Sequence, residues 1–194
     1  MREPSRLASW VERPLFAPWR VRAWAGLPAG RLLEVGVGAG ANLTYYPSGA
    51  AVTAIDVNPR RIEAARRRAA ALGLPVDLRV MNAETLEFPD GYFDAAVATL
   101  VFCSVPDPVR GLRELARAVK PGGEIRLIEH VRVDLPLIGR LMDLLDPLAV
   151  LIGGEHINRR TMENIARAGL PVVSVKKLTP SGMVKFIVAR SPAR

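Results

Sequence analysis

From residue 31 onward, short apolar runs of strand type alternate with segments of helical periodicity, and no other feature restricts the fold as much. Asn58 and Asp107 each stand directly before a proline, a pair typical of a helix start. Strands that alternate with helices form βαβ units, so we expect an α/β fold with a mostly parallel sheet and helices on both of its faces. The expected parallel strands are residues 31–37, 52–57, 76–81, 93–100 and 124–130.

The C-terminal part adds two more strand-like runs, residues 171–178 and 183–190. Pro180, Ser181 and Gly182 lie between these runs and are typical of a turn. We therefore expect a closing antiparallel hairpin that completes a seven-stranded sheet.

Residues 135–153 interrupt the alternation of strands and helices. Leucines recur there at helical spacing, and Asp143 and Asp146, three residues apart, share one face of the expected helix. Pro147 is expected to kink or break that helix. We expect the leucines to pack in the core; the alternative is an apolar wall over an active site.

Size and composition indicate one soluble globular domain. The chain has 194 residues, of which 49% are hydrophobic and 24% charged, and both values are ordinary for such proteins. No apolar run reaches the ~18 residues that a transmembrane helix needs. The single cysteine, Cys103, excludes an internal disulfide and fits a reducing compartment. We therefore expect a cytoplasmic protein, with peripheral contact at the inner membrane surface as an option.

The first thirty residues form a segment of different character from the domain expected over residues 31–194. They carry all three tryptophans, interleaved with arginines and interrupted by Pro14 and Pro18. Such a segment is either a lid whose aromatic side chains pack on the domain or an element that lies at a membrane interface. The net charge of +8 attracts anionic lipid, nucleic acid or phosphorylated ligands, although composition bias of the genome explains it equally well.

A glycine-rich stretch over residues 34–40 ends the first strand and is expected to open a helix. Glycines there let the backbone turn sharply and let a ligand approach the main chain. Asp56 follows Gly36 by 20 residues, a spacing that places a carboxylate near both ribose hydroxyls of an adenosine group. An adenosine cofactor is therefore expected, and NAD and S-adenosylmethionine both fit this pattern.

Glu34 favours S-adenosylmethionine, because a carboxylate suits the positive amino group of a methionine tail and would repel a pyrophosphate. Residues 82–84 (Asn-Ala-Glu) follow the third strand, where polar groups can reach an adenine. Residues 88–94 lead into the fourth strand, and residues 120–123 precede the fifth. This series, from about Arg31 to the C-terminus, resembles the class I S-adenosylmethionine-dependent methyltransferases, which implies their Rossmann-like fold.

A narrower resemblance is to the methyltransferase-like 7 group, which includes animal alkyl thiol methyltransferases of lipid droplets and the reticulum. Bacterial relatives of that group are often labelled phospholipid N-methyltransferases. The strings that carry it are residues 40–47, 99–105, 129–130, 145–147 and 153–159. This chain departs from the group in two ways: it has no hydrophobic anchor at its N-terminus, and Glu155 stands where relatives carry cysteine.

The resemblance implies which residues hold S-adenosylmethionine. Asp56 would hold the ribose, Ala83 and Glu84 would meet the adenine, and residues 99–101 would run beneath the sulfonium and methyl. The full implied set is Glu34, Gly36, Val37, Gly38, Asn42, Asp56, Val57, Asn82, Ala83, Glu84, Thr99, Leu100 and Val101.

Methyl transfer requires an acceptor that has lost its proton and is aligned in a site without water. Glu129 and His130 are the candidate catalytic residues, because His130 ends a strand and ligands bind beyond that edge of a parallel sheet. The candidate acceptor-side residues are Cys103, Asp146, His156 and Arg159. Cys103 is more typical of an inert buried cysteine, and the cysteine and histidines show no familiar metal spacing, so no metal is expected.

The sequence thus predicts a methyltransferase with a small or lipophilic acceptor, most specifically a phospholipid amine of the phosphatidylethanolamine type. Hydrophobic thiols are the first alternative. Nucleic acid is a weaker alternative, because residues 99–102 lack the Asn/Asp-Pro-Pro-aromatic string of amine-methylating enzymes that act on it. A nicotinamide-dependent oxidoreductase and a non-catalytic adenosine-binding protein are weaker still.

Overall fold

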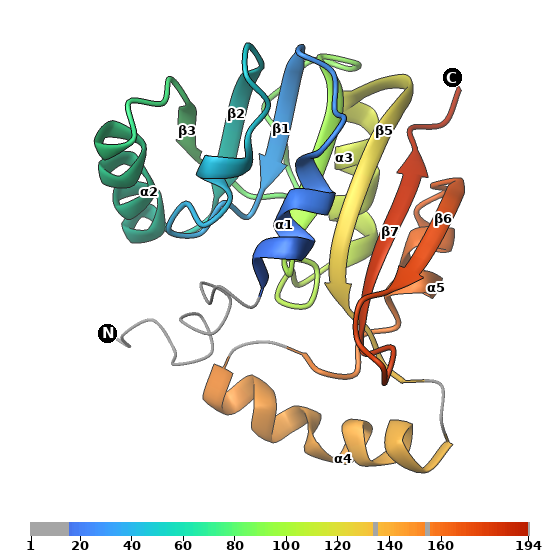
Figure 1. The fold of residues 1–194 in the computed structure, drawn as a ribbon. Helices are drawn as coiled ribbons and strands as arrows, with labels where there is room; N and C mark the ends of the chain where they lie inside the picture. The colour runs from blue at the N-terminus through green and yellow to red at the C-terminus, as the bar shows by residue number, and fades with distance from the viewer. Residues whose placement is uncertain (1–15, 134–135, 154–155, 194) are drawn as a thin grey trace.

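The computed structural model describes residues 16–133, 136–153 and 156–193 (Figure 1). One seven-stranded sheet forms its centre, with the strand order β3-β2-β1-β4-β5-β7-β6. The elements in chain order are α1 (Ala17–Trp24), β1 (Arg31–Val35), η2 (Leu43–Tyr45), β2 (Ala51–Asp56), α2 (Pro59–Ala71), β3 (Asp77–Val80), β4 (Phe93–Thr99), α3 (Pro108–Ala118), β5 (Val119–His130), α4 (Pro136–Gly153), α5 (Thr161–Arg167), β6 (Val172–Lys177) and β7 (Val184–Arg190).

The first five strands pair in parallel, and β7 inserts antiparallel between β5 and β6. The predicted Rossmann-like fold, its parallel part and its C-terminal hairpin are therefore confirmed. Because the order of strands reverses between β1 and β4, the carboxyl ends of these two strands diverge into a crevice, which is where α/β sheets bind ligands.

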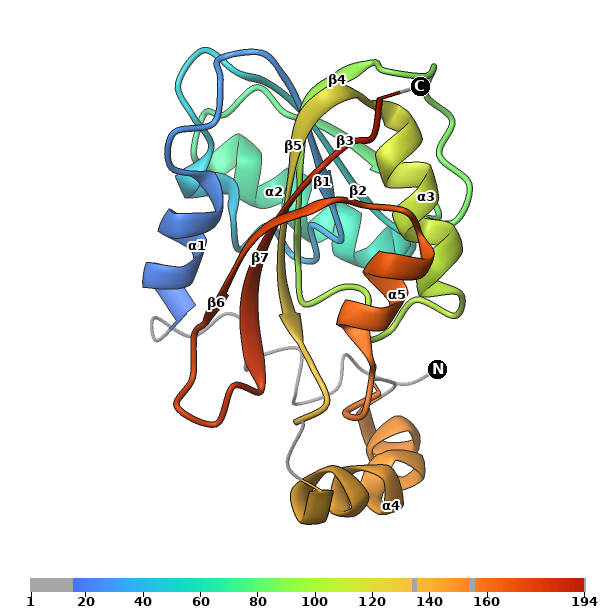
Figure 2. The same ribbon diagram turned by 90° about the vertical axis from the view of Figure 1, so that its right-hand side faces the viewer.

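Alternate side chains of the strands fill two separate layers of core, as the pleat requires. Leu32 and Val97 face α1, and Ala54 on the same side of the sheet packs on α2. Leu33 and Ala96 face the other way, among core residues of α3 and α5. Figure 2 shows these helices covering the two faces of the sheet, as the sequence predicts.

The described part of the N-terminal segment belongs to the body of the domain. Trp24 and Ala23 in α1 are fully buried, and the ring of Trp24 lies 4.5 Å from that of Tyr46. Phe16 is also buried against Trp19, at a ring distance of 4.7 Å. Trp10 and the rest of residues 1–15 lie outside the described residues.

Two predicted boundaries are wrong. The glycine-rich stretch opens no α-helix: after turns at residues 38–42 the chain makes only the short η2, because Gly38 and Gly40 adopt positive φ, at 56° and 86°, and Pro47 follows soon after. The fifth strand starts at Val119 rather than at residue 124. Val119 pairs with Phe93, while residues 120–123 form an irregularity before the regular pairing resumes.

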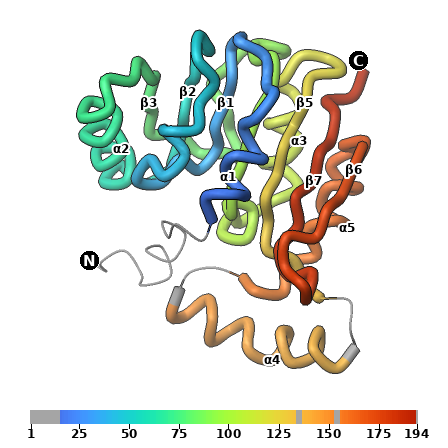
Figure 3. The backbone as a smooth tube through the Cα atoms, viewed as in Figure 1, coloured from blue at the N-terminus to red at the C-terminus, as the bar shows by residue number. Residues whose placement is uncertain are grey.

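The prediction for the leucines of residues 135–153 is also wrong. Helix α4 runs without a break through Pro147, and its leucines do not enter the core. Figure 3 shows the chain leaving β5, passing through α4 at one end of the molecule and returning to α5. The exposed large side chains of α4 are Leu137, Ile138, Leu141, Leu144, Leu145, Leu148, Leu151 and Ile152. No helix within the described residues is long and apolar enough to cross a bilayer.

Candidate cofactor and acceptor site

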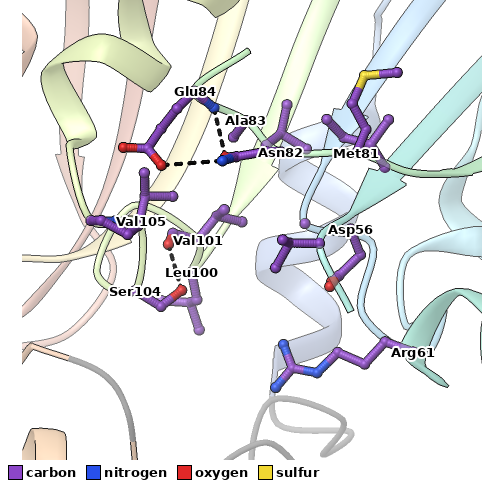
Figure 4. Close-up of a pocket in the computed structure, with 15 residues that line it drawn as sticks. Asp56, Arg61, Met81, Asn82, Ala83, Glu84, Leu100, Val101, Ser104 and Val105 are labelled. Carbon is purple, nitrogen blue, oxygen red and sulfur yellow. Dashed lines mark hydrogen bonds between the residues drawn. The ribbon is translucent and has the colours of Figure 1, made fainter. Parts of the chain in front are cut away.

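A pocket of about 310 Å³ opens at the carboxyl ends of β1, β2 and β4 (Figure 4). This size falls at the lower end of the ~300–1,000 Å³ typical of small-molecule sites. The lining includes eight of the thirteen predicted cofactor residues: Gly36, Asp56, Val57, Asn82, Ala83, Glu84, Leu100 and Val101. The crevice is thus where the spacing of Gly36 and Asp56 predicts it.

Gly36 brings the main chain close to the loop after β4. Its φ is +74°, and a Cβ at this position would lie 2.3 Å from Cγ2 of Val101. No side chain larger than hydrogen fits there without moving Val101. The backbone N–H groups of Gly36 and Val37 both donate to the carbonyl of Ile55, which ties the loop to β2.

The Asp56 carboxylate is held firmly at the end of β2. Its Oδ2 accepts a hydrogen bond from the backbone of Gly38 at 3.0 Å, and its Oδ1 accepts one from Asn58 at 2.9 Å. These bonds use only part of the capacity of an ionised carboxylate, which has about four acceptor positions. Asp56 can therefore bind ribose hydroxyls while it fixes the glycine-rich loop.

Residues 82–84 form a rigid polar turn on the opposite side of the pocket. The side-chain oxygen of Asn82 accepts from the backbone of Glu84 at 2.9 Å. The Glu84 carboxylate in turn accepts from the backbone of Asp107 at 2.8 Å, just before α3 begins. Figure 4 shows Asn82 and Glu84 side by side, across the pocket from Arg61.

The loop after β4, residues 100–106, completes the lining with Leu100, Val101, Ser104, Val105 and Pro106. Leu100 has a φ of +56°, the left-handed region that leucine rarely adopts, and such strain persists only where the surroundings enforce it. The backbone of Leu100 donates to Ile128 at 2.7 Å. Glu129 supplies a second restraint, because its Oε1 accepts from the backbones of Val101 and Phe102 at 3.0 and 3.1 Å.

These contacts locate the two candidate catalytic residues. Glu129 is fully buried behind the loop, where its carboxylate positions the backbone of residues 101 and 102. The Nδ1 of His130 is buried without a hydrogen-bond partner among the described residues. Burial lowers the pKa of His130 below its usual value, so this imidazole is neutral near pH 7.

A buried polar network lies below the pocket and contains the three polar predicted residues that do not line it. Glu34 is fully buried and accepts hydrogen bonds from Asn42 and from the hydroxyl of Tyr46. Asn42 also donates to Thr99 at 3.3 Å and accepts from Arg20 of α1. Burial raises the pKa of Glu34 from 4.5 to about 7, although the hydrogen bonds and the charge of Arg20 work in the opposite direction.

The four candidate acceptor-side residues come together beside the loop after β4. The carbonyl of Cys103 accepts from the backbone of His156 at 3.1 Å and from Nε of Arg159 at 3.4 Å. Arg159 also donates to the carbonyl of Val105 at 2.9 Å. Asp146 lies 2.8 Å from Nδ1 of His156 through its Oδ2. The Cys103 side chain itself is buried, as its apolar surroundings predict.

Two candidate site residues, Arg61 and Arg20, escaped the sequence analysis. Arg61, in the first turn of α2, lines the pocket near Asp56, and its place just past the strand end was the available signal. Arg20 reaches the Glu34 network from an N-terminal helix, and nothing distinguishes it from the other arginines of that segment. Among the described residues, no group of three or more histidine, cysteine, aspartate or glutamate side chains could hold a metal ion.

Comparison with known proteins identifies the family. The sequence profile described as "Methyltransferase domain" matches residues 33–127. The phosphatidylethanolamine N-methyltransferase of Cereibacter sphaeroides is 34% identical over 170 residues, which cover 87% of this chain and 83% of that protein. The chain belongs to the class I S-adenosylmethionine-dependent methyltransferases.

Two further similarities agree with this assignment. The thiol S-methyltransferase TMT1A of Homo sapiens is 33% identical to this methyltransferase over 175 residues, which cover 86% of this chain and 70% of that protein. The crystal structure of an S-adenosylmethionine-dependent methyltransferase from Methanosarcina mazei superposes with a TM-score of 0.69 at 27% identity. That superposition covers 94% of this chain and 99% of the other.

S-adenosylmethionine is the cofactor of this methyltransferase, and the pocket fits it. Gly36 lines the pocket with backbone alone, and the Asp56 carboxylate adds acceptor positions suited to hydroxyl groups. The polar turn at residues 82–84 provides hydrogen-bonding groups for an adenine. No group in this lining demands a different cofactor.

Replacing Gly36 with alanine tests the close approach at the pocket. The added Cβ would displace Val101, so we expect Gly36→Ala to weaken S-adenosylmethionine binding at least tenfold by isothermal titration calorimetry. Gly73→Ala is the matched control, because Gly73 also has a positive φ, of +65°, but open space around it. The control should bind normally and lose only about 1 kcal/mol of stability. Equal loss of binding in both variants would contradict this role of Gly36.

The raised pKa of Glu34 predicts a pH-dependent stability. An unfolded chain releases this proton near pH 4.5, whereas the folded protein keeps it until about pH 7. The stabilisation is therefore complete below pH 4.5 and is lost as the pH rises to 7, by about 3 kcal/mol. Glu34→Gln should lack this decline when urea unfolding is compared between pH 5 and 8. Parallel pH profiles of the two proteins would show that Glu34 titrates normally.

Proposed function

We propose that this methyltransferase transfers the S-adenosylmethionine methyl group to a lipophilic acceptor, most specifically the headgroup amine of a phosphatidylethanolamine-type phospholipid. The observation that carries this proposal is the loop of residues 100–106, which lines the cofactor pocket and also binds the cluster of Asp146, His156 and Arg159. Asp146 of this cluster belongs to α4, whose apolar side chains are exposed. An acceptor bound beside this cluster would therefore lie next to the loop that lines the cofactor pocket.

The residues of the pocket would hold the cofactor by its separate parts. Asp56 would bind the ribose hydroxyls, and Asn82 and Glu84 the adenine edge. The backbone around Gly36 and the Glu34 network would hold the methionine portion. When bound, S-adenosylmethionine supplies a methyl carbon that its sulfonium activates for attack.

The amine must lose its proton before attack, and His156 would take it in this proposal. Asp146 lies at hydrogen-bond distance from Nδ1 of His156, so an Nδ1–H donated to Asp146 leaves Nε2 free to accept a proton. Burial raises the pKa of Asp146, but hydrogen bonds from His156, Ile157 and Asn158 outweigh it and lower that pKa overall. Asp146 thus stays ionised and orients the imidazole of His156. His130, neutral and partly buried, is the second candidate base.

Arg159 and Glu129 have separate roles in this proposal. The Arg159 guanidinium lies beside the loop through its bonds to Cys103 and Val105, where it adds positive charge suited to a phosphate group. Glu129 is a positioning residue, because its carboxylate holds the backbone of residues 101 and 102. The positive charge of Arg159 favours a phosphorylated headgroup over a neutral acceptor.

A hydrophobic thiol is the alternative acceptor, since the relative TMT1A is named as a thiol S-methyltransferase. The same base would convert the thiol into a thiolate, whereas the positive charge of Arg159 would then lack a phosphate partner. Either acceptor is compatible with peripheral contact between this basic chain and an anionic membrane, where lipophilic acceptors concentrate.

The proposal is tested by methyl-labelled S-adenosylmethionine with the purified protein and vesicles that contain phosphatidylethanolamine. A parallel reaction holds a hydrophobic thiol in place of the vesicles. We expect label in the lipid, and a fall of about 10²–10⁴-fold in kcat for His156→Gln, which removes the base. S-adenosylmethionine affinity should stay unchanged in that variant.

The control is Asn158→Ala, which removes a neighbouring side chain that donates to Asp143 but leaves His156 and Asp146 in place. Label on the thiol alone would show that the acceptor is a thiol and not an amine. If the His156→Gln enzyme were as fast as the wild type, His156 would not be the base. Label in neither acceptor would overturn the lipophilic class.

A further inference from the structure

Helix α4 has an amphipathic arrangement that is the reverse of a normal surface helix. At 100° per residue, its exposed apolar side chains fall within a continuous arc of about 140°. Six of them define the apolar face of α4, with exposed fractions of 82% for Leu137, 54% for Leu141, 76% for Leu144, 53% for Leu148, 63% for Leu151 and 65% for Ile152. Between residues 137 and 152 no charged residue falls inside this arc.

The opposite side of the same helix carries its polar residues and faces the protein. Asp146 is buried there and accepts hydrogen bonds from the backbones of Ile157 and Asn158. Asp143 pairs with Arg132 through two bonds of 2.8 and 3.0 Å. The attachment of α4 to the domain is thus largely polar, while its leucines face outward. Exposure of these leucines to water is energetically unfavourable, so the orientation indicates that a partner covers them.

The apolar face of α4 lies at the same end of the molecule as the pocket. Figures 1 and 2 show α4 beyond the carboxyl ends of the parallel strands, the end of the sheet at which the pocket opens. Asp146 on its inner side contacts His156, which binds the carbonyl of Cys103 in the loop that lines the pocket. A surface docked against α4 therefore lies next to the acceptor side.

The charges around this end of the molecule favour an anionic bilayer as the partner. Arg140 is exposed at the margin of the apolar arc, and Asp143 and Glu163, two acidic residues of the described part of this end, are paired with arginines. The β6–β7 hairpin, whose turn lies at the same end in Figures 1 and 2, carries the exposed Lys176 and Lys177. An exposed leucine face with Arg140 beside it, and lysines of β6 at the same end of the molecule, suits contact with an anionic membrane interface.

A second copy of the chain is a less suitable partner for the same face. Two helices that pack against one another need only a narrow seam of apolar residues, with charged residues beside it. The arc of about 140° on α4 is much wider than such a seam. It also lacks the charged pairs that fix the register of packed helices.

We propose that the apolar face of α4 is a membrane-docking surface that inserts among the headgroups of an anionic bilayer and presents the acceptor side to lipid. This inference rests on the proposed function for its lipophilic acceptor, but the docking itself needs no catalysis. The inner side of α4 then orients Asp146 and His156 toward the loop of residues 100–106, so one helix both binds the bilayer and supports the site.

Vesicle flotation tests the docking surface directly. The probe is vesicles of phosphatidylglycerol and phosphatidylethanolamine, with phosphatidylcholine vesicles as the neutral comparison. We expect the wild type to float with the anionic vesicles, and Leu144→Ser/Leu148→Ser to bind them at least tenfold more weakly. The matched control is Leu72→Ser/Val173→Ser, which removes two apolar side chains of 43% and 59% exposure elsewhere on the surface and should float like the wild type.

Two further measurements separate this inference from the proposed function. The Leu144→Ser/Leu148→Ser variant should bind S-adenosylmethionine normally and methylate a short-chain, water-soluble phosphatidylethanolamine at the wild-type rate, which excludes misfolding. Docking that depends on α4 without methylation of lipid or thiol would contradict the proposed function and support the docking surface.

Three results would overturn the docking surface. The wild type could fail to bind anionic vesicles, or the α4 variant could bind them as tightly as the wild type does. The third result is a wild-type dimer in sedimentation velocity that the α4 variant converts to monomer and that does not bind vesicles, since the face would then be a subunit interface.

Discussion

The loop after β4 is held from two directions, and the proposed activity depends on that double attachment. Glu129 binds its backbone from the core side, and the left-handed Leu100 is enforced there by a hydrogen bond to β5. His156 and Arg159 bind its carbonyl groups from the other side. Because these residues belong to different parts of the chain, the geometry of the cofactor pocket and that of the acceptor side cannot change independently.

A second constraint comes from burying a carboxylate beneath the pocket. Glu34 is satisfied by Asn42 and Tyr46, and Arg20 extends the network to α1. Burial without these partners would cost several kcal/mol, so α1 contributes to the site although it lies outside the α/β alternation. The described part of the N-terminal segment therefore supports the cofactor loop from below, with Trp24 buried in the same layer.

Much of the fold was predictable because it follows from local patterns. The strand runs, the helix starts at Asn58 and Asp107 and the turn at residues 180–182 are all encoded by neighbouring residues. The spacing of Gly36 and Asp56 placed the cofactor crevice for the same reason. The η2 turn was missed because the pattern of a glycine-rich loop does not say whether a helix follows. Long-range contacts, such as those of Glu129 and Arg20, have no local signal at all.

For the leucines of α4 the local signal was correct, but the interpretation of it was wrong. Their helical periodicity is real, but periodicity states only that one face differs from the other and not which face meets the protein. Asp143 and Asp146 on the second face decide the orientation, because their partners Arg132 and His156 belong to the domain. Hydrophobic spacing could not predict that these two acidic side chains would attach the helix to the domain.

Hydrogen–deuterium exchange of the apo protein and of its complex with S-adenosylhomocysteine tests most directly whether the loop after β4 joins the two halves of the site. The account predicts slower amide exchange upon binding not only at residues 34–57 and 82–84, but also at residues 100–106 and 156–160. In Glu129→Gln the protection of residues 100–106 should weaken together with that of residues 156–160. Protection confined to residues 34–57 and 82–84 would contradict the account, because the acceptor side would then be independent of the cofactor.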